Sequence, residues 1–146
     1  MFRGNHPARV DEKGRLKLPA EFMRRCKDVY GDQFYITSKD GKRAEIYPLK
    51  EWEKIEERLA QIPSMNPNKK KFLDVTNYYG QMAQMDEQGR VLIPAILRQA
   101  ASVKGEVVVL GSQTYLELVN HDAFKAELES QPLTMDDQAA LADLGL

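Results

Sequence analysis

The sequence contains a single cysteine, Cys26, among 146 residues. One cysteine excludes an internal disulfide, and sparing use of cysteine is typical of proteins in a reducing compartment. Cys26 also falls on the apolar side of a predicted short helix, where a thiol behaves as a small core residue. We therefore expect a cytoplasmic protein in which Cys26 belongs to the core.

Long apolar runs are missing as well. The stretch from Val107 to Leu110 is among the longest, and it is far too short to cross a bilayer. The first residues lack the apolar segment of a secretion signal. Because 42% of the residues are hydrophobic and 29% are charged, we expect a soluble globular chain with no membrane partner.

Residues that commonly carry catalysis or bind metals are scarce. The only two histidines, His6 and His121, are isolated from each other and from Cys26. No pair has the spacing of metal ligands, and no glycine-rich phosphate loop is present. We therefore predict that the chain is not an enzyme, with no catalytic residues, metal, cofactor or small-molecule substrate.

The sequence does contain one motif in two copies. Residues 11–20 read Asp-Glu-Lys-Gly-Arg-Leu-Lys-Leu-Pro-Ala, and residues 86–95 read Asp-Glu-Gln-Gly-Arg-Val-Leu-Ile-Pro-Ala. The offset between them is a constant 75 positions. The chain is therefore built from two related units.

Each copy has the chemistry of a β-hairpin turn. Asp11 and Asp86 open the turns, because an aspartate carboxylate accepts a hydrogen bond from a backbone N–H two residues on. Gly14 and Gly89 supply the positive φ that follows. Apolar residues alternate on both sides, which predicts a strand before and a strand after each turn.

The arginine after each turn glycine is not needed to shape the turn, so its side chain is available for binding. Arg15 and Arg90 begin the outgoing strands. The proline four residues later ends each strand and suits the first turn of a helix, where a missing N–H costs nothing. From the residues alone, each arginine could either pair with its own turn aspartate or bind a ligand.

The remaining pattern predicts further elements in a similar order in each unit. Strands are expected at residues 5–10, 15–18, 33–37, 44–47, 81–85, 90–93, 106–110 and 115–119. Helices are expected at residues 19–27, 49–62, from an Asn66 cap onward, 94–101 and from an Asn120 cap onward. The strand at 106–110 is nearly all aliphatic, which predicts burial on both faces.

We predict an α+β fold in which two pseudo-symmetric β units form one barrel with flanking helices. The first unit covers residues 5–50, connecting helices cover 51–76, and the second unit covers 77–124. Residues 125–146 form an acidic C-terminal helix or tail. Each unit alone has too few apolar residues for a secure core, so we expect the two hairpins to pack together in one compact domain.

Charge is unevenly distributed, although the net charge is only −1. Residues 1–17 carry five basic and two acidic side chains, whereas residues 105–146 carry eight acidic and one basic. Such asymmetry favours one face that meets an anion, with simple solubility as the alternative. Lys69-Lys70-Lys71 could touch phosphate or could be a solvated helix face.

These features together resemble the MraZ family, a branch of the AbrB-like swapped-hairpin DNA-binding proteins. The resemblance rests on the doubled Asp-x-x-Gly-Arg turn followed by proline. Shorter passages add to it: Met1–Gly4, Tyr47–Leu49 with Glu51-Trp52, Ser64–Pro67, and Gly89–Pro94 with Leu97-Arg98. It covers residues 1 to about 128, and it is weakest in the acidic tail and at Tyr78–Met82.

The resemblance implies a bacterial transcriptional regulator of the division and cell-wall gene cluster, associated with the nucleoid. It implies a homo-oligomeric ring, an octamer or larger, whose turns face repeats in double-stranded promoter DNA. Arg15 and Arg90 are the expected DNA contacts. Four more basic residues would bind phosphates: Arg3, Arg9, Lys13 and Lys17.

Positive charge gathers around Gly14 and not around Gly89, since the residues near Arg90 in the sequence include no other basic side chain. We therefore expect the first turn to supply most of the DNA affinity. An antitoxin-like protein-binding module on the same fold is the alternative. Such modules usually carry one hairpin unit and a long tail, whereas this chain has two units and a short tail.

Overall fold

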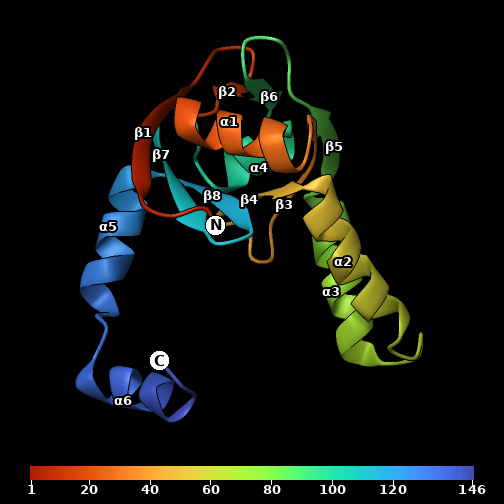
Figure 1. Cartoon of the computed structure of the whole chain (residues 1–146), viewed down its shortest axis with the longest axis vertical. Helices are drawn as coiled ribbons and strands as arrows, with labels where there is room; N and C mark the ends of the chain where they lie inside the picture. The colour runs from red at the N-terminus through yellow and green to blue at the C-terminus, as the bar shows by residue number, and fades with distance from the viewer.

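The computed structural model describes residues 1–146 and contains eight strands and six helices (Figure 1). The strands are β1 (Asn5–Val10), β2 (Arg15–Lys17), β3 (Gln33–Thr37), β4 (Ala44–Pro48), β5 (Gln81–Gln84), β6 (Arg90–Leu92), β7 (Gly105–Ser112) and β8 (Tyr115–Val119). The helices are α1 (Ala20–Val29), α2 (Leu49–Ala60), α3 (Pro67–Tyr78), α4 (Ala95–Ala100), α5 (His121–Ser130) and α6 (Met135–Asp143). The predicted α+β class is confirmed.

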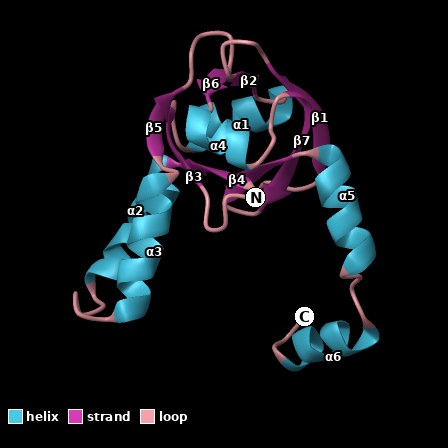
Figure 2. Ribbon diagram, turned by 180° about the vertical axis from the view of Figure 1, so that it is seen from behind, coloured by secondary structure: helices cyan, strands magenta, loops and turns pink.

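All eight strands belong to one antiparallel sheet with the order β5-β3-β4-β8-β7-β1-β2-β6. The sheet curls into a nearly closed barrel (Figures 1 and 2). Its two edge strands, β5 and β6, are consecutive in the chain and are joined by the second turn. Curling brings the two edges toward each other, which protects backbone groups that an open sheet would expose.

One hydrophobic core is shared by both units. The first unit contributes Leu16, Leu18, Ile36 and Ile46, and the second contributes Val91, Ile93, Leu116 and Leu118. The helices α1 and α4 add Phe22, Cys26 and Leu97. Cys26 is fully buried in this core, as the sequence predicted, and burial raises the pKa of its thiol to about 12.

Strand β7 differs from its prediction. Val107 and Val109 are buried, whereas Val108 and Leu110 are only partly buried. The reason is the antiparallel sheet: one face packs on the core, and nothing covers the other completely. The expectation of burial on both faces is therefore wrong.

The predicted second hairpin is also wrong in its pairing. β5 pairs with β3, and β6 pairs with β2, so the strands on either side of the second turn do not pair with each other in the sheet. In the first copy, β1 and β2 share only the pair Val10–Leu16. Local sequence determines the turn, whereas long-range packing chooses the partner of each strand.

Two helical arms extend from the barrel on opposite sides, both away from the two turns (Figures 1 and 2). The α2–α3 arm is anchored by the buried Trp52. The centroid of its ring lies 4.8 Å from the ring centroid of Tyr35 and 6.4 Å from that of Phe72. The α5 arm is held by Arg43, which bonds Glu117 at 2.9 Å and Glu127 at 3.1 Å. These contacts fix both arms to the barrel wall.

The caps predicted for α3 and α5 are present. The Asn66 side chain accepts hydrogen bonds from the backbone N–H groups of Asn68 and Lys69, and Asn120 accepts one from Ala123. Helix α6 begins with a capping box between Thr134 and Asp137. Every residue from 125 to 146 is nevertheless exposed. None of the helices is both long enough and apolar enough to span a membrane.

The centre of the β2–β6 pair gives a direct test of the shared core. Leu16→Ala should lower the free energy of unfolding by about 2–5 kcal/mol, because it leaves a cavity at a fully buried site opposite Val91. Leu92→Ala is the matched control, since Leu92 is 55% exposed, and should change stability by about 0.5 kcal/mol or less. Urea unfolding followed by circular dichroism measures both, and equal losses would contradict the shared core.

Candidate nucleic-acid interface

The two turns have the same hydrogen bonds. In the first, Asp11 Oδ1 accepts from the backbone N–H of Lys13 at 3.0 Å and of Arg15 at 2.9 Å. In the second, Asp86 Oδ1 accepts from Gln88 and Arg90, both at 2.9 Å. Gly14 and Gly89 have φ values of 85° and 79°, which side chains with a Cβ adopt only under strain. Each turn is therefore a rigid local unit.

Both motif arginines pair with their turn aspartates through one nitrogen. Arg15 Nε donates to Asp11 Oδ2 at 2.9 Å, and Arg90 Nε donates to Asp86 Oδ2 at 2.8 Å. The Nη groups of both arginines make no hydrogen bond or ion pair within the chain. The two alternatives for these arginines are thus compatible, since the aspartate orients the side chain and the outer nitrogens stay free.

The strands after the two turns form a short antiparallel ribbon. Its register pairs Arg15 with Leu92, Leu16 with Val91, and Lys17 with Arg90. Leu16 and Val91 face the core, so the residues on either side of them face outward. Three cations therefore share the outer face of the ribbon.

The position of Arg90 corrects one sequence-based expectation. Arg90 is not without basic neighbours, because Lys17 of the first unit lies directly opposite it. Side chains at directly opposite positions have Cβ atoms about 5 Å apart, and like charges there are destabilising. The ribbon thus places two cations at opposite positions, of which Arg90 is paired with Asp86.

Reciprocal hydrogen bonds link the turns to the ribbon. The backbone N–H of Leu18 donates to the carbonyl of Gly89, and the N–H of Ile93 donates to the carbonyl of Gly14, both at 2.9 Å. Each turn is therefore bonded to the strand end of the other unit. The turns are held side by side at one end of the barrel (Figures 1 and 2).

The remaining predicted basic residues lie at different distances from this ribbon. Lys13 is exposed within the first turn, and Arg9 is exposed on β1. Arg3 precedes β1 and lies against Gly111 on β7. The whole length of β1 therefore separates Arg3 from the first turn, whereas Arg9 lies next to the turn and Lys13 lies within it.

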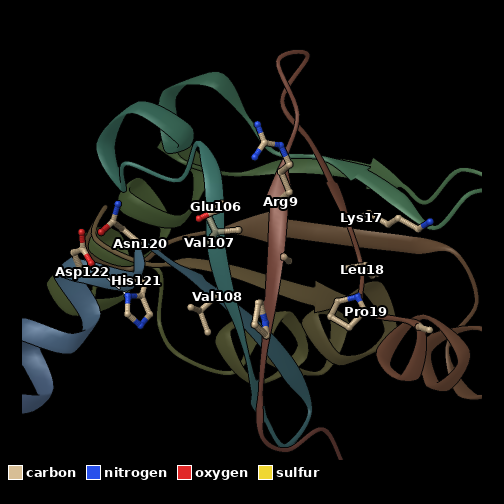
Figure 3. Close-up of a pocket in the computed structure, with 13 residues that line it drawn as sticks. Arg9, Lys17, Leu18, Pro19, Glu106, Val107, Val108, Asn120, His121 and Asp122 are labelled. Carbon is tan, nitrogen blue, oxygen red and sulfur yellow. Dashed lines mark hydrogen bonds and ion pairs between the residues drawn. The ribbon is translucent and has the colours of Figure 1, made fainter.

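A hollow of about 850 Å³ runs along the outside of β1 and β7 (Figure 3). Arg9 and Lys17 lie on its β1 and β2 side, while Glu106 and Asp122 line it from β7 and α5. Because its walls carry both signs of charge, this hollow does not favour an anion. Of its two cations, Lys17 belongs to the ribbon and Arg9 lies beside it on β1.

Sequence reasoning missed one basic residue at the first turn. The guanidinium of Arg98, on α4, occupies the space that a side chain at Gly14 would fill. Met23, on α1, occupies the matching space at Gly89. Positions 23 and 98 are separated by the repeat offset of 75, so comparison of the two copies could have identified both.

The two histidines lie outside the ribbon. His6 Nε2 lies 3.8 Å from Glu21 and its ring packs on Phe22, while His121 faces Asp122. No group of three or more His, Cys, Asp or Glu side chains is arranged to hold a metal ion. The ribbon and its turns are thus the clearest candidate for a functional site.

Comparison with known proteins identifies the family of the chain. The family described as "MraZ protein, putative antitoxin-like" matches residues 1–75 and 81–144. The chain belongs to the MraZ family. The first matched stretch contains one copy of the turn motif, and the second stretch contains the other.

Curated MraZ relatives match along their whole length. A protein of Acidobacterium capsulatum is 68% identical over 146 residues, and one of Koribacter versatilis is 54% identical over 147, with all of each chain covered. A protein of Neisseria meningitidis is 32% identical over 151 residues, also with full coverage. Each is named transcriptional regulator MraZ.

The turn hydrogen bonds make a prediction about pH. The backbone N–H of Arg15 and then its guanidinium lower the pKa of Asp11, and Arg90 lowers the pKa of Asp86 in the same way. A lowered pKa adds stability above the ordinary aspartate value, and this stability is lost as the pH falls through the folded pKa. Carboxyl NMR titration should show both midpoints below the ordinary range.

Arg15→Gln provides the control for that titration. The guanidinium is removed but the backbone N–H remains, so Asp11 should keep part of its lowered pKa. Asp86 should be unchanged, because its partner is Arg90. A complete return of the Asp11 midpoint to the ordinary value would contradict the assignment to the backbone hydrogen bond.

Proposed function

We propose that the chain is a sequence-specific DNA-binding transcriptional regulator that presents Arg15 and Arg90 to promoter DNA. Membership of the MraZ family and the names of its relatives support transcriptional regulation. The observation that carries the DNA contact is the β2–β6 ribbon. It places Arg15, Lys17 and Arg90 on one outer face and leaves both arginines with free Nη groups.

The free guanidinium nitrogens match two features of DNA. A guanidinium forms paired hydrogen bonds with a phosphate or with guanine O6 and N7. A two-stranded ribbon also fits a major groove about 12 Å wide. Because Asp11 and Asp86 hold their arginines by Nε, little side-chain freedom is lost on binding.

The first turn supplies more of the affinity than the second. Lys13 and Arg9 flank the first turn, and Lys17 lies on the strand that follows it, where phosphate contacts position the reader element. The equivalent residues of the second unit, at the offset of 75, are Gln88, Gln84 and Leu92. Arg3 makes a more distant phosphate contact, since β1 separates it from the turn.

The two units adopt the AbrB-like swapped-hairpin arrangement. Two observations support it: each turn glycine accepts a hydrogen bond from the strand end of the other unit, and each is covered by a side chain from the other unit's helix. In such an arrangement neither unit completes its turn surface alone. This explains why the motif occurs twice in one chain.

The chain assembles into a ring of eight or more copies that binds promoter repeats of the division and cell-wall gene cluster on the nucleoid. Exposed apolar residues support self-association: the α6 segment presents Leu133, Met135, Leu141, Leu144 and Leu146. Several copies that bind adjacent repeats would gain affinity by effective concentration. Each single turn then needs only weak affinity.

An antitoxin-like protein-binding module is the second candidate. The family description contains the words antitoxin-like, and the exposed apolar α6 could contact another protein. The two functions separate experimentally, since a protein partner would bind the arms and DNA would bind the turns. Co-purification of a toxin whose binding requires α6 would favour this candidate.

The main test compares the two arginines on DNA upstream of the chain's own gene. Arg15→Ala should weaken binding by about 1–3 kcal/mol for each engaged turn, because the guanidinium no longer bonds a base or a phosphate. Arg90→Ala should cost less, because fewer cations flank the second turn. Footprinting and a binding titration over a range of salt concentrations measure both losses.

Arg58→Ala is the matched control, because Arg58 is exposed on α2, a helix of the arm that extends away from the turns (Figure 1). It removes the same charge and should leave binding unchanged. Equal losses for the two turn variants would contradict the asymmetry. Absence of protection with the unmodified chain would contradict the proposed function.

Removal of residues 132–146 tests the assembly. The barrel should remain folded, because these residues are exposed and none belongs to the core. The assembly should become smaller, because the apolar surface of α6 is removed. Light scattering after gel filtration measures the mass, with the exposed polar substitution Gln138→Ala as the control, and an unchanged mass after truncation would exclude α6 from the contact.

A further inference from the structure

The first turn does not need the positive charge of Arg98 for its packing. The guanidinium of Arg98 covers the buried Gly14, and it makes no hydrogen bond or ion pair with any carboxylate of the chain. At the second turn, the uncharged side chain of Met23 covers Gly89 in the same way. Since methionine is sufficient to cover a turn of the same geometry, the positive charge of Arg98 calls for a different explanation.

Arg98 lines an open hollow of about 940 Å³ beside the first turn. The hollow lies between β1, the first turn, α4 and the start of β7, and its cations are Arg9, Arg98 and Lys104. None of the three side chains is paired within the chain. Three unpaired cations around one hollow form an anion-binding surface.

Two carboxylates, Asp11 and Glu12, also line this hollow. Asp11 is already occupied, because its two oxygens accept three hydrogen bonds from Lys13 and Arg15. Glu12 is exposed in the turn and makes no ion pair. Glu106 stands directly opposite Arg9 on β7 but does not line this hollow. Among the residues that line the hollow, the unpaired cations therefore outnumber the unpaired carboxylates.

The second unit lacks this arrangement. At the repeat offset, Gln84 stands in place of Arg9 and Met23 in place of Arg98, while Arg24 stands in place of Gln99. Asp86 and Glu87 repeat the two acidic residues. The hollow beside the first turn therefore has three cations, of which Lys104 lies beyond the matched segment. The equivalent positions at the second turn have one cation, Arg24.

We propose that Arg9, Arg98 and Lys104 form a phosphate-binding site that holds the DNA backbone beside the base pairs that Arg15 approaches. The proposal rests on the proposed DNA-binding function and adds to it a site formed by β1, α4 and the residue that precedes β7. The planar guanidinium of Arg98 offers paired hydrogen bonds to phosphate oxygens, and Lys104 adds a point charge. Phosphate contacts position a protein without reading sequence.

The test is Arg98→Met, which copies the residue found at the second turn. Its binding to a duplex from upstream of the chain's own gene, and to an unrelated duplex, is followed by fluorescence anisotropy at several salt concentrations. We expect affinity for both duplexes to fall by about tenfold, the usual value of one charged hydrogen bond. The slope of log affinity against log salt should become shallower by about 0.9 for each phosphate that the variant no longer neutralises.

Arg25→Met is the matched control, because Arg25 is exposed on α1 and does not line the hollow. It should bind as the unmodified chain does. Lys104→Met is a second test at an exposed residue, so the proposal remains testable if Arg98→Met unfolds. It should also weaken binding to both duplexes and reduce the salt slope.

Three outcomes would overturn the assignment while the unmodified chain still binds its duplex. Arg98→Met and Lys104→Met could bind with unchanged affinity and salt slope. Arg98→Met could lose affinity only for the upstream duplex, which would make Arg98 a base contact. Arg25→Met could lose as much as Arg98→Met, which would show a general charge effect. Failure of the unmodified chain to bind either duplex would instead contradict the proposed function itself.

Discussion

The reciprocal pairing of β2 with β6 is the interaction on which the rest of the structure depends. Leu18 donates to the carbonyl of Gly89 and Ile93 donates to that of Gly14, so neither turn is completed within its own unit. Between these bonds, Leu16 and Val91 are both fully buried. Because the pairing joins residues about 75 positions apart, it forms only when both halves have come together.

This pairing also explains how a small chain presents a rigid polar surface. The residues that alternate with Leu16 and Val91 must face outward, and three of the four are cationic: Arg15, Lys17 and Arg90. A surface of this kind on a flexible loop would lose entropy on binding. Here the ribbon loses its conformational entropy during folding, when it packs on the core. The aspartates of the two turns orient the arginines.

Internal symmetry makes each unit a natural comparison for the other. The backbone of the turn is repeated closely, down to the two hydrogen bonds that each aspartate carboxylate accepts from the backbone, whereas the surrounding charge is not repeated. Differences between Arg98 and Met23, or between Arg9 and Gln84, therefore do not arise from the needs of the fold. They support the proposal that the two turns contribute unequally to DNA binding.

The sequence by itself determined the local structure: turn geometry, helix caps and most element boundaries follow from contacts within about four residues. Asp11, Gly14 and Arg15 lie within one such stretch, so their arrangement could be predicted. Only the tertiary structure decided which strands pair, that β7 is covered on one face, that Lys17 lies opposite Arg90, and that Arg98 covers Gly14. Those contacts join residues far apart in the chain, and they depend on how two apolar faces pack into one barrel, which no local pattern encodes.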